Sequence, residues 1–323
     1  MCTAVSYKTK DHYFGRNLDL EYSYNEEVVI TPRNYPFSFR KMPAIACHYA
    51  MIGIATVANN YPLYYEATNE CGLSMAGLNF PGNAFYFPVD SQNDNLAPFE
   101  LIPWMLSQCN CIEQVTEKLE YLNICDVPFS NQFPLSPLHW MISDANKSLV
   151  LEQTKDGLHW YDNSVGILTN NPPFPYHQHN LQNYMHLTTG DQQNNLRFSM
   201  HAQGYSRGMG AIGLPGDFSS ASRFIKAAFV KNHSVSGESE ESSVNQYFRI
   251  LDSVAMPRGC VDVHGKHEIT AYSSCCNTDK GIYYYKTYEN SQISAVNMFH
   301  EDLNSSDLLV FPLVLSPQFK SIN

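Results

Sequence analysis

The sequence predicts an α+β fold with largely antiparallel sheets, and three observations support this prediction. Strand-like segments form groups at the start, middle and end of the chain, and helix-like segments lie between these groups. Turn-like stretches join several successive strands. Hydrophobic residues make up 44% and charged residues 16% of the 323 residues, a globular profile that can bury a sizeable core. No repeat or low-complexity boundary divides the chain, so we expect one domain over residues 1–323.

The first group of strands opens with a hairpin. Residues 2–7 and 11–16 have strand patterns, and the stretch between them is turn-like. Further strands are expected at 27–31 and 50–57, and a second hairpin joins 63–67 to 73–77. Gly72 can take the positive φ that the turn of this hairpin requires. Residues 83–95 are polar and interrupted by proline, which predicts a loop.

Two helices are expected next. The first runs from Pro98 to about residue 106, because proline is tolerated in a first helical turn. The second covers 111–122, where apolar residues recur at helical spacing. Strands then return at 139–143, 149–154, 157–161 and 166–170.

The last third combines helices, a long connection and strands. Residues 177–187 are expected to be helical, and residues 191–216 are glycine-rich and long for a structureless connection, which indicates a functional or assembly arm. Helices are expected from Ser219, with Phe224, Ile225 and Ala228 on one face, and at 244–256, after a polar linker. The final strands are expected at 268–273, 282–287 and 293–296.

Charge, cysteine usage and motifs exclude several classes of protein. The 31 acidic and 20 basic residues, a net charge of −11, argue against a nucleic-acid partner. Nine cysteines occur without paired metal-ligand spacing, and the twelve histidines include no HExxH pattern, so we expect no metal and no cofactor. No signal region and no apolar run of spanning length is visible, so a cytoplasmic protein without stable membrane association is expected.

The first nineteen residues carry the clearest chemical pattern. Cys2 follows Met1, and a small residue in second place suits removal of the initiator methionine, which would leave a thiol and an α-amine on one residue. Such an amine can take the thiol proton without a histidine. The hairpin returns Arg16 and Asp19 to this terminus, where a guanidinium favours a thiolate and a carboxylate orients an ammonium. The alternative is that Cys2 merely begins a strand and that Arg16 and Asp19 form a surface ion pair.

Several motifs follow one another in order along nearly the whole chain. They are Met1-Cys2-Thr3, Phe14-Gly15-Arg16-Asn17-Leu18-Asp19, Ile30-Thr31-Pro32-Arg33, Met75-Ala76-Gly77-Leu78-Asn79-Phe80, Pro134-Leu135-Ser136-Pro137-Leu138-His139-Trp140, Leu168-Thr169-Asn170-Asn171-Pro172, Gly213-Leu214-Pro215-Gly216-Asp217, Ser222-Arg223-Phe224 and Tyr272-Ser273-Ser274-Cys275-Cys276-Asn277. With these motifs the chain resembles the choloylglycine hydrolase family, which comprises bile salt hydrolases and penicillin V acylases. The similarity is closest to the bile salt hydrolases of gut lactic acid bacteria. The resemblance implies the four-layer αββα sandwich of N-terminal nucleophile (Ntn) hydrolases.

The resemblance also implies roles for individual residues. Cys2 would be the nucleophile, and the Asn170 side chain with the main-chain N–H of Asn79 would bind the oxyanion. Without the resemblance, each asparagine is better explained as a turn or strand-end cap. Arg223 would join Arg16 and Asp19 in the catalytic network. Its position near the start of a predicted helix, where the dipole does not favour a cation, agrees with a role other than helix stabilisation.

The implied reaction is hydrolysis of glycine- or taurine-conjugated bile salts, of the glycocholate and taurocholate type, by a homotetramer whose 191–216 arm reaches between subunits. Asn79 stands where penicillin V acylases tend to carry tyrosine. An apolar pocket should hold the steroid. Its candidate residues are Leu20, Tyr24, Phe80, Phe129, Phe133 and Leu135, for each of which ordinary core packing is the alternative. The rival functions are a penicillin V acylase and a non-catalytic bile-acid-binding protein.

Overall fold

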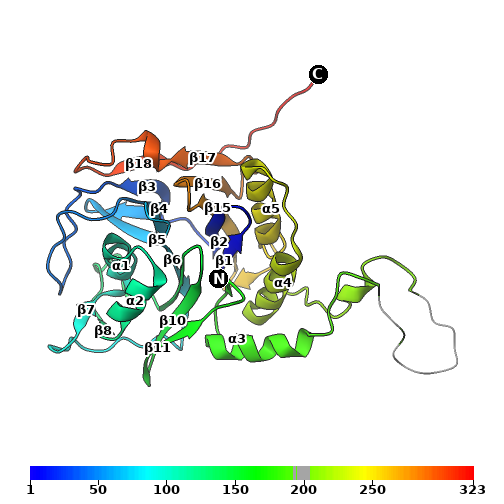
Figure 1. Ribbon diagram of the computed structural model, residues 1–323, viewed down its shortest axis with the longest axis horizontal. Coiled ribbons are helices and arrows are strands. Elements are labelled where there is room, and N and C mark those ends of the chain that lie inside the picture. The colour runs from blue at the N-terminus through cyan, green and yellow to red at the C-terminus, as the bar shows by residue number, and fades with distance from the viewer. Residues whose placement is uncertain (192–193, 195–203) are drawn as a thin grey trace.

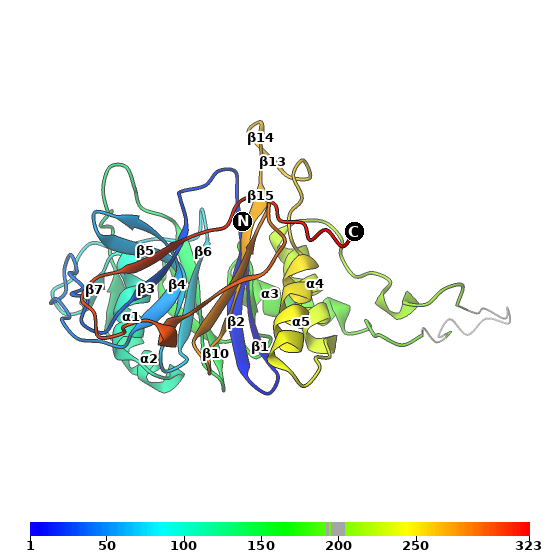
Figure 2. The ribbon, with the colours of Figure 1, turned by 90° about the horizontal axis from the view of Figure 1, so that it is seen from above.

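The computed structural model describes residues 1–191, 194 and 204–323, and it has four layers. Two β-sheets pack face to face, and helices cover the outer face of each sheet (Figures 1 and 2). This arrangement confirms the predicted α+β class and the αββα sandwich. It brings strands from both ends of the sequence into neighbouring positions at the centre of the molecule.

The first sheet contains the N-terminal hairpin at its centre. Its order is β12-β1-β2-β15-β16-β17, and its neighbouring strands pair antiparallel. In the hairpin Cys2 lies opposite Leu18 and Ala4 opposite Arg16. The strands are β1 (Cys2–Lys8), β2 (His12–Leu20), β12 (Ile167–Leu168), β15 (Ile269–Asn277), β16 (Ile282–Thr287) and β17 (Ser294–Asn297).

The second sheet is also antiparallel, and its order is β11-β10-β9-β6-β5-β4-β3-β18. Its strands are β3 (Glu27–Thr31), β4 (Met51–Ala58), β5 (Tyr61–Asn69), β6 (Ser74–Asn79), β9 (Leu138–Ser143), β10 (Ser148–Thr154), β11 (Gly157–Asp162) and β18 (Leu309–Pro312). Two further short pairs are β7 (Asp94–Leu96) with β8 (Leu122–Ile124), which is parallel, and β13 (Asp262–Val263) with β14 (Lys266–His267).

Helices from different parts of the sequence cover the two sheets. Helices α1 (Leu101–Gln108) and α2 (Ile112–Leu119) lie against the second sheet, and α4 (Ser220–His233) and α5 (Glu240–Asp252) lie against the first (Figure 2). Helix α3 (Phe174–Leu181) packs beside α4. Short 3-10 helices are η1 (Pro98–Glu100), η2 (Gln182–Tyr184), η3 (Met209–Ala211) and η4 (Met298–His300).

The hydrophobic core is divided by the second sheet. Val28 and Ile30 belong to a cluster that continues through the first sheet to α4 and α5, whereas Val29 belongs to a cluster under α1 and α2. Alternate side chains of one strand point to opposite faces of a sheet. Strand β3 is therefore buried on both faces, which explains its uninterrupted run of apolar residues.

Several element boundaries differ from the predictions. The helix expected at 177–187 is α3, which begins at Phe174 because prolines suit its start. The helix expected at 244–256 begins at Glu240, where the Ser239 side chain accepts a hydrogen bond from Ser242 N. Strands β7, β8, β13, β14 and β18 lie outside the expected strands. β7 pairs with β8 and β18 with β3 across long stretches of the chain, which local patterns do not reveal, whereas β13 and β14 pair locally but contain only two residues each.

The predicted arm at 191–216 is only partly described, since residues 192–193 and 195–203 of it lie outside the described residues. Its described part from Gly204 onward contains η3 and extends away from the four layers (Figure 1). Among the residues that the structure describes, no helix combines the length and apolar character needed to cross a membrane.

Candidate active site

Cys2 begins β1 in the centre of the first sheet and is only 3% exposed. Its main-chain N–H donates a hydrogen bond to Oδ1 of Asn170 over 2.8 Å. The antiparallel pairing of β1 with β2 carries Arg16 and Asp19 to the same end of the hairpin. Three other predicted site residues, Asn170, Arg16 and Asp19, therefore lie near the buried main-chain nitrogen of Cys2.

Asn170 lies just beyond β12, and its amide is fixed from both sides. Oδ1 accepts hydrogen bonds from Cys2 N and from Nη2 of Arg223, the latter over 2.7 Å. Nδ2 donates to the main-chain oxygen of Asn79 over 2.7 Å. Because two donors meet one end of the amide and a carbonyl meets the other, its orientation is determined. The second hydrogen on Nδ2 remains available to another acceptor.

Arg223 lies in the first turn of α4 and is buried. Its Nη1 donates to the main-chain oxygen of Cys2 over 2.5 Å and to Oγ1 of Thr3 over 2.6 Å. Burial lowers the pKa of Arg223, and the charges of Asp19 and Cys2 partly oppose this effect. These contacts offset the unfavourable position of a cation at a helix N-terminus. Arg223 thus joins the helical layer to the first residue of β1.

Asp19 is fully buried, and its Oδ2 lies 3.9 Å from Nη1 of Arg223. Its Oδ1 accepts a hydrogen bond from Oγ1 of Thr270 over 2.6 Å, and its main-chain oxygen accepts one from the Met1 amine over 2.8 Å. Burial raises the pKa of Asp19, while the charges of Arg223 and of the terminal amine and the Thr270 hydrogen bond act in the opposite direction. The carboxylate is therefore held beside the start of the chain.

Arg16 connects the two sheets at a place where the second sheet is split. The pairing of β5 with β6 stops at Glu66 opposite Ala76, and Tyr65 is the extra residue of a β-bulge between β4 and β5. The carbonyls of Tyr65 and Gly77 thus lack each other as ladder partners. Nη1 of Arg16 donates to both, over 3.1 and 2.5 Å respectively.

Glu66 provides the counter-charge for Arg16. Its Oε2 lies 3.8 Å from Nη1 of Arg16, and it accepts hydrogen bonds from Tyr272, Tyr283 and Ser274. Burial raises the pKa of Glu66, and Arg16 and the three hydroxyl groups counteract this effect. The ion pair is completely buried between the sheets.

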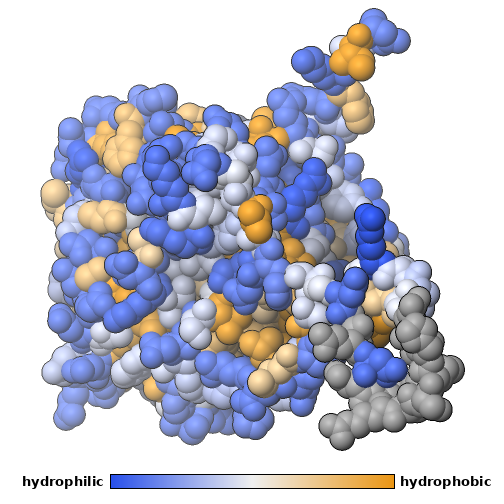
Figure 3. Space-filling model, turned by 45° about the vertical axis from the view of Figure 1, so that its right-hand side comes forward, coloured by the Kyte–Doolittle hydropathy of each residue, from blue (hydrophilic) through white to orange (hydrophobic). Residues whose placement is uncertain are grey.

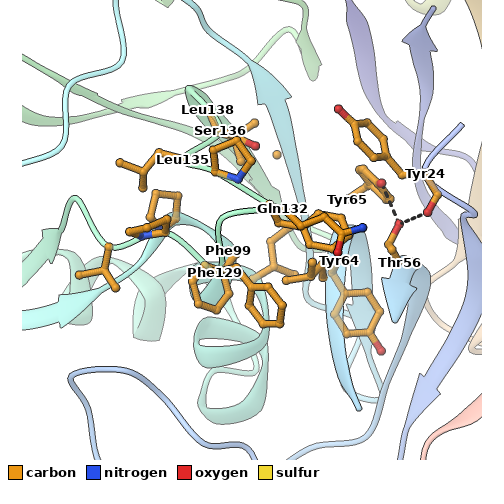
Figure 4. Close-up of a pocket in the computed structure, with 18 of the residues that line it drawn as sticks. Tyr24, Thr56, Tyr64, Tyr65, Phe99, Phe129, Gln132, Leu135, Ser136 and Leu138 are labelled. Atoms are coloured by element: carbon orange, nitrogen blue, oxygen red, sulfur yellow. Dashed lines mark hydrogen bonds between the residues drawn. The ribbon is translucent and has the colours of Figure 1, made fainter. Parts of the chain in front are cut away.

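A cavity of about 220 Å³ lies at the same split. Tyr65 and Gly77 line it, so the residues that bind Arg16 through their carbonyls also border the cavity. At one side Thr56 hydrogen-bonds to Tyr65 Oη and to the main-chain oxygen of Tyr24, whereas Leu135, Ser136 and Leu138 lie at another side (Figure 4). The lining is mainly apolar and aromatic. It suits a broad hydrophobic ligand with few polar groups.

Four of the six residues predicted for the pocket line this cavity, namely Tyr24, Phe129, Phe133 and Leu135. Leu20 and Phe80 do not line it. Phe80 is fully buried and stacks on His139, with ring centroids 4.2 Å apart. Leu20 is partly buried and packs against the core between the sheets.

Sequence reasoning missed several residues of the site. We call Cys2, Arg16, Asp19, Asn170, Arg223 and their polar partners the cluster; its missed members are Thr3, Glu66 and Thr270. Around the cavity, the missed residues include Thr56, Leu63, Phe99, Ile102, Gln132 and Trp140. Glu66 and Thr270 are isolated polar residues within strands, which is the one signal that could have indicated them. The cavity residues carry no such signal, because they resemble ordinary core residues.

Comparison with known proteins agrees with this geometry. Residues 2–311 match the model of the family described as linear amide C–N hydrolases, choloylglycine hydrolase family. The chain is 50% identical to a bile salt hydrolase/transferase of Lactiplantibacillus plantarum, with all of both chains covered. It is 39% identical to a bile salt hydrolase/transferase of Clostridium perfringens, with 96% of each chain covered.

One solved structure is similar in both sequence and fold, and a more distant one shares the fold. A variant of the conjugated bile acid hydrolase of Clostridium perfringens matches with a TM-score of 0.92 and 37% identity over the whole of both chains. The penicillin V acylase of Agrobacterium tumefaciens shares the fold, with a TM-score of 0.76 at 16% identity over 97% of this chain and 92% of that one. The resemblance drawn from the motifs is confirmed, and the chain belongs to the choloylglycine hydrolase family of linear amide C–N hydrolases.

Proposed function

We propose that this protein hydrolyses the amide bond of glycine- and taurine-conjugated bile salts, with Cys2 as the nucleophile and without a cofactor. The names of the two relatives above support the substrate class. The observation that carries the mechanism is the buried hydrogen bond from Cys2 N to Oδ1 of Asn170, beside Arg223 and Asp19. Once Met1 is removed, that nitrogen becomes the α-amine of the nucleophilic residue.

In the first half of the reaction, the α-amine of Cys2 takes the thiol proton, and the thiolate attacks the substrate carbonyl. Asn170 Oδ1 is a hydrogen-bond acceptor for the resulting ammonium. The negative charge that develops on the carbonyl oxygen is stabilised by the free hydrogen on Asn170 Nδ2 and by the main-chain N–H of Asn79. When the C–N bond breaks, the ammonium donates its proton to the leaving nitrogen. Glycine or taurine departs and a thioester remains.

In the second half, the α-amine accepts a proton from a water molecule that attacks the thioester carbonyl. The same donors bind the second oxyanion. Collapse of this intermediate breaks the C–S bond and releases the bile acid, and the ammonium returns its proton to the leaving sulfur, which restores both the thiol and the neutral amine. Arg223, Arg16 and Asp19 hold the main chain and charges around Cys2, since all three are buried and directly linked to it or to the adjoining strands.

The cavity at the split of the second sheet is the proposed steroid site. Its aromatic lining, including Phe99, Phe129 and Phe133, offers apolar surface, and Tyr65 and Gly77 connect it to Arg16. In this pose the steroid lies in the cavity and its amide side chain extends toward Cys2. Leu20 and Phe80 remain predicted contacts outside the cavity.

Release of amino acid from glycocholate and taurocholate, with phenoxymethylpenicillin in parallel, tests this proposal. We expect fast turnover of the bile salts, loss of turnover in Cys2→Ala and unaltered turnover in Cys71→Ala, an exposed cysteine outside the cluster. Preference for phenoxymethylpenicillin would assign the acyl specificity of a penicillin V acylase instead. Absence of turnover on all three, with Met1 removed, would leave a bile-acid-binding protein.

For assembly and location we propose a cytoplasmic homotetramer in which the 191–216 arm contacts other subunits. The described part of this region projects from the layers and carries exposed apolar side chains, including Tyr205 (84% exposed) and Ile212 (51%). Apolar areas also occur beside the grey segment in the space-filling view (Figure 3). Exposed apolar groups on an extended segment favour contact with another chain. Light scattering of the intact protein tests this, and a monomeric mass would contradict it.

A further inference from the structure

Two carbonyl groups at the end of β12 need hydrogen-bond donors from outside the sheet. Strand β12 ends at Leu168, and the next two residues, Thr169 and Asn170, run on to the cluster around Cys2. Both residues are buried. A buried carbonyl without a donor is costly, so the structure must supply one for each.

Two buried histidines are these donors. Nε2 of His139 lies 2.9 Å from the Thr169 oxygen, and Nε2 of His177 lies 2.9 Å from the Asn170 oxygen. A carbonyl oxygen can only accept, so in each ring Nε2 carries the hydrogen. His139 is held in turn by Glu152, whose Oε1 lies 3.0 Å from its Nδ1.

The His177 ring has little freedom to move. It lies on α3 and is completely buried, and it stacks on Phe224 with centroids 4.8 Å apart and planes 21° apart. Phe224 follows Arg223 directly in α4. The His177 ring, which binds the Asn170 carbonyl, is thus packed against α4, whose Arg223 binds the Asn170 side chain.

With these contacts every polar atom of Asn170 is fixed. Its main-chain N–H donates to Ser220 Oγ over 2.8 Å, and its side chain is bound at both ends. In the described part of the chain, the hydrogen bond from His177 Nε2 to the Asn170 oxygen is the main-chain contact of Asn170 that comes from α3. Without it, the main chain of Asn170 would be held through the Ser220 hydrogen bond alone, so the Cα from which the side chain extends, and with it Nδ2, would be placed less precisely.

We propose that His177 is a positioning residue for the reaction, because its Nε2–H fixes the Asn170 carbonyl and thereby the Nδ2 donor of the oxyanion site. The inference rests on the proposed function of Asn170. Within the described residues, His177 does not line the cavity and makes no hydrogen bond with Cys2. Its effect should therefore appear in kcat and depend on Asn170.

A double-mutant cycle in the full chain with glycocholate tests this. His177→Phe keeps the stacked ring and removes the donor, and we expect kcat to fall about 10- to 100-fold with KM little changed, as for a slightly misplaced catalytic group. In the Asn170→Ala background the same substitution should lower kcat by no more than about threefold, because residues that act as a unit are not additive. His177→Gln, which can present an N–H at the same reach, should restore much of the loss.

His48→Phe is the matched control. His48 is also buried, also contacts a phenylalanine ring, and its Nε2 lies 2.8 Å from the Tyr35 oxygen, but it is outside the cluster. We expect it to lower resistance to urea without an Asn170-dependent change in kcat. Equal losses from His177→Phe in both backgrounds, or no loss in either, would overturn the positioning role. Absence of wild-type turnover would instead count against the proposed function.

Discussion

The buried ion pair between Arg16 and Glu66 yields a prediction about stability and its pH dependence. Replacing Arg16 by methionine keeps a long apolar side chain and removes the guanidinium. The carbonyls of Tyr65 and Gly77 then lose the donor that bridges them, and Glu66 loses the cation that lies 3.8 Å away. The main-chain oxygen of Asn17 also loses the Arg16 Nε donor, so four buried polar groups are left with fewer partners.

The magnitude follows from the burial of these groups. Removing one partner of a buried ion pair typically costs about 3–5 kcal/mol, because an uncompensated charge remains. We expect Arg16→Met to lower the free energy of unfolding by about this amount. Adding Glu66→Gln removes the uncompensated charge and keeps groups that can meet the Tyr272, Tyr283 and Ser274 hydroxyls, so the double variant should recover about 1–3 kcal/mol of the loss.

The loss should grow with pH. Burial already raises the pKa of Glu66 in the intact protein, and Arg16 opposes that rise. In Arg16→Met the folded-state pKa rises further above the unfolded value, so the native state binds more protons than the unfolded state between those two values. The stabilising contribution of this carboxyl is then fully present only at low pH and is lost as the pH rises. The deficit of Arg16→Met should be larger at pH 8 than at pH 5.

Urea unfolding followed by tryptophan fluorescence at both pH values measures these differences. Arg33→Met is the matched control, because Arg33 pairs with Glu70 near the surface and is 37% exposed, so its loss should cost only about 0–1 kcal/mol. A double variant no more stable than Arg16→Met, or a deficit that shrinks toward pH 8, would refute the assigned role of Glu66.

Three further predictions concern the chemistry. Asn170→Ala should lower kcat about 10²- to 10³-fold with a much smaller change in KM in steady-state kinetics. Asn163→Ala is the control for packing, because Asn163 is a buried asparagine that bonds Ile167 and Gly166 at the start of β12; an equal loss in this variant would contradict a specific role of Asn170. Asn79→Tyr should shift the ratio of penicillin to bile-salt turnover toward phenoxymethylpenicillin, and an unchanged ratio would contradict the assigned specificity role. Intact mass should show loss of Met1 in active protein, whereas full activity with Met1 retained would exclude the α-amine of Cys2 as the base.

Local spacing was enough to predict part of the site. A two-stranded hairpin with a short turn returns Arg16 and Asp19 to Cys2 whatever the rest of the fold, because antiparallel pairing fixes which residues lie opposite each other. Asn170 and Arg223 are different. They reach Cys2 through β12 and α4, and only the family resemblance connected them to it before the structure did.

The split of the second sheet could not be read from the sequence. It depends on the bulge at Tyr65 and on the end of pairing between β5 and β6, and both result from competition among strands that are distant along the chain. Apolar residues such as Phe99 and Ile102 consequently look like core residues until this opening is known. The α+β class was predictable because most strands and helices carry their own periodic pattern, and the four layers were predictable only through the family resemblance. The opening between two strands carries no such pattern.

The split also separates two sets of residues that can change independently in evolution. The proposed catalytic cluster comes from β1, β2, the segment after β12, and α4, whereas the cavity wall comes mainly from β5, η1 and residues 127–138. The two sets meet at Tyr65 and Gly77, whose carbonyls bind Arg16 through main-chain atoms that every amino acid possesses. If the proposed roles hold, exchange of the 127–138 segment would alter the wall of the cavity, and thus the acyl group that fits it, while the contacts around Cys2 stay unchanged. The same nucleophile could then be combined with different acyl specificities.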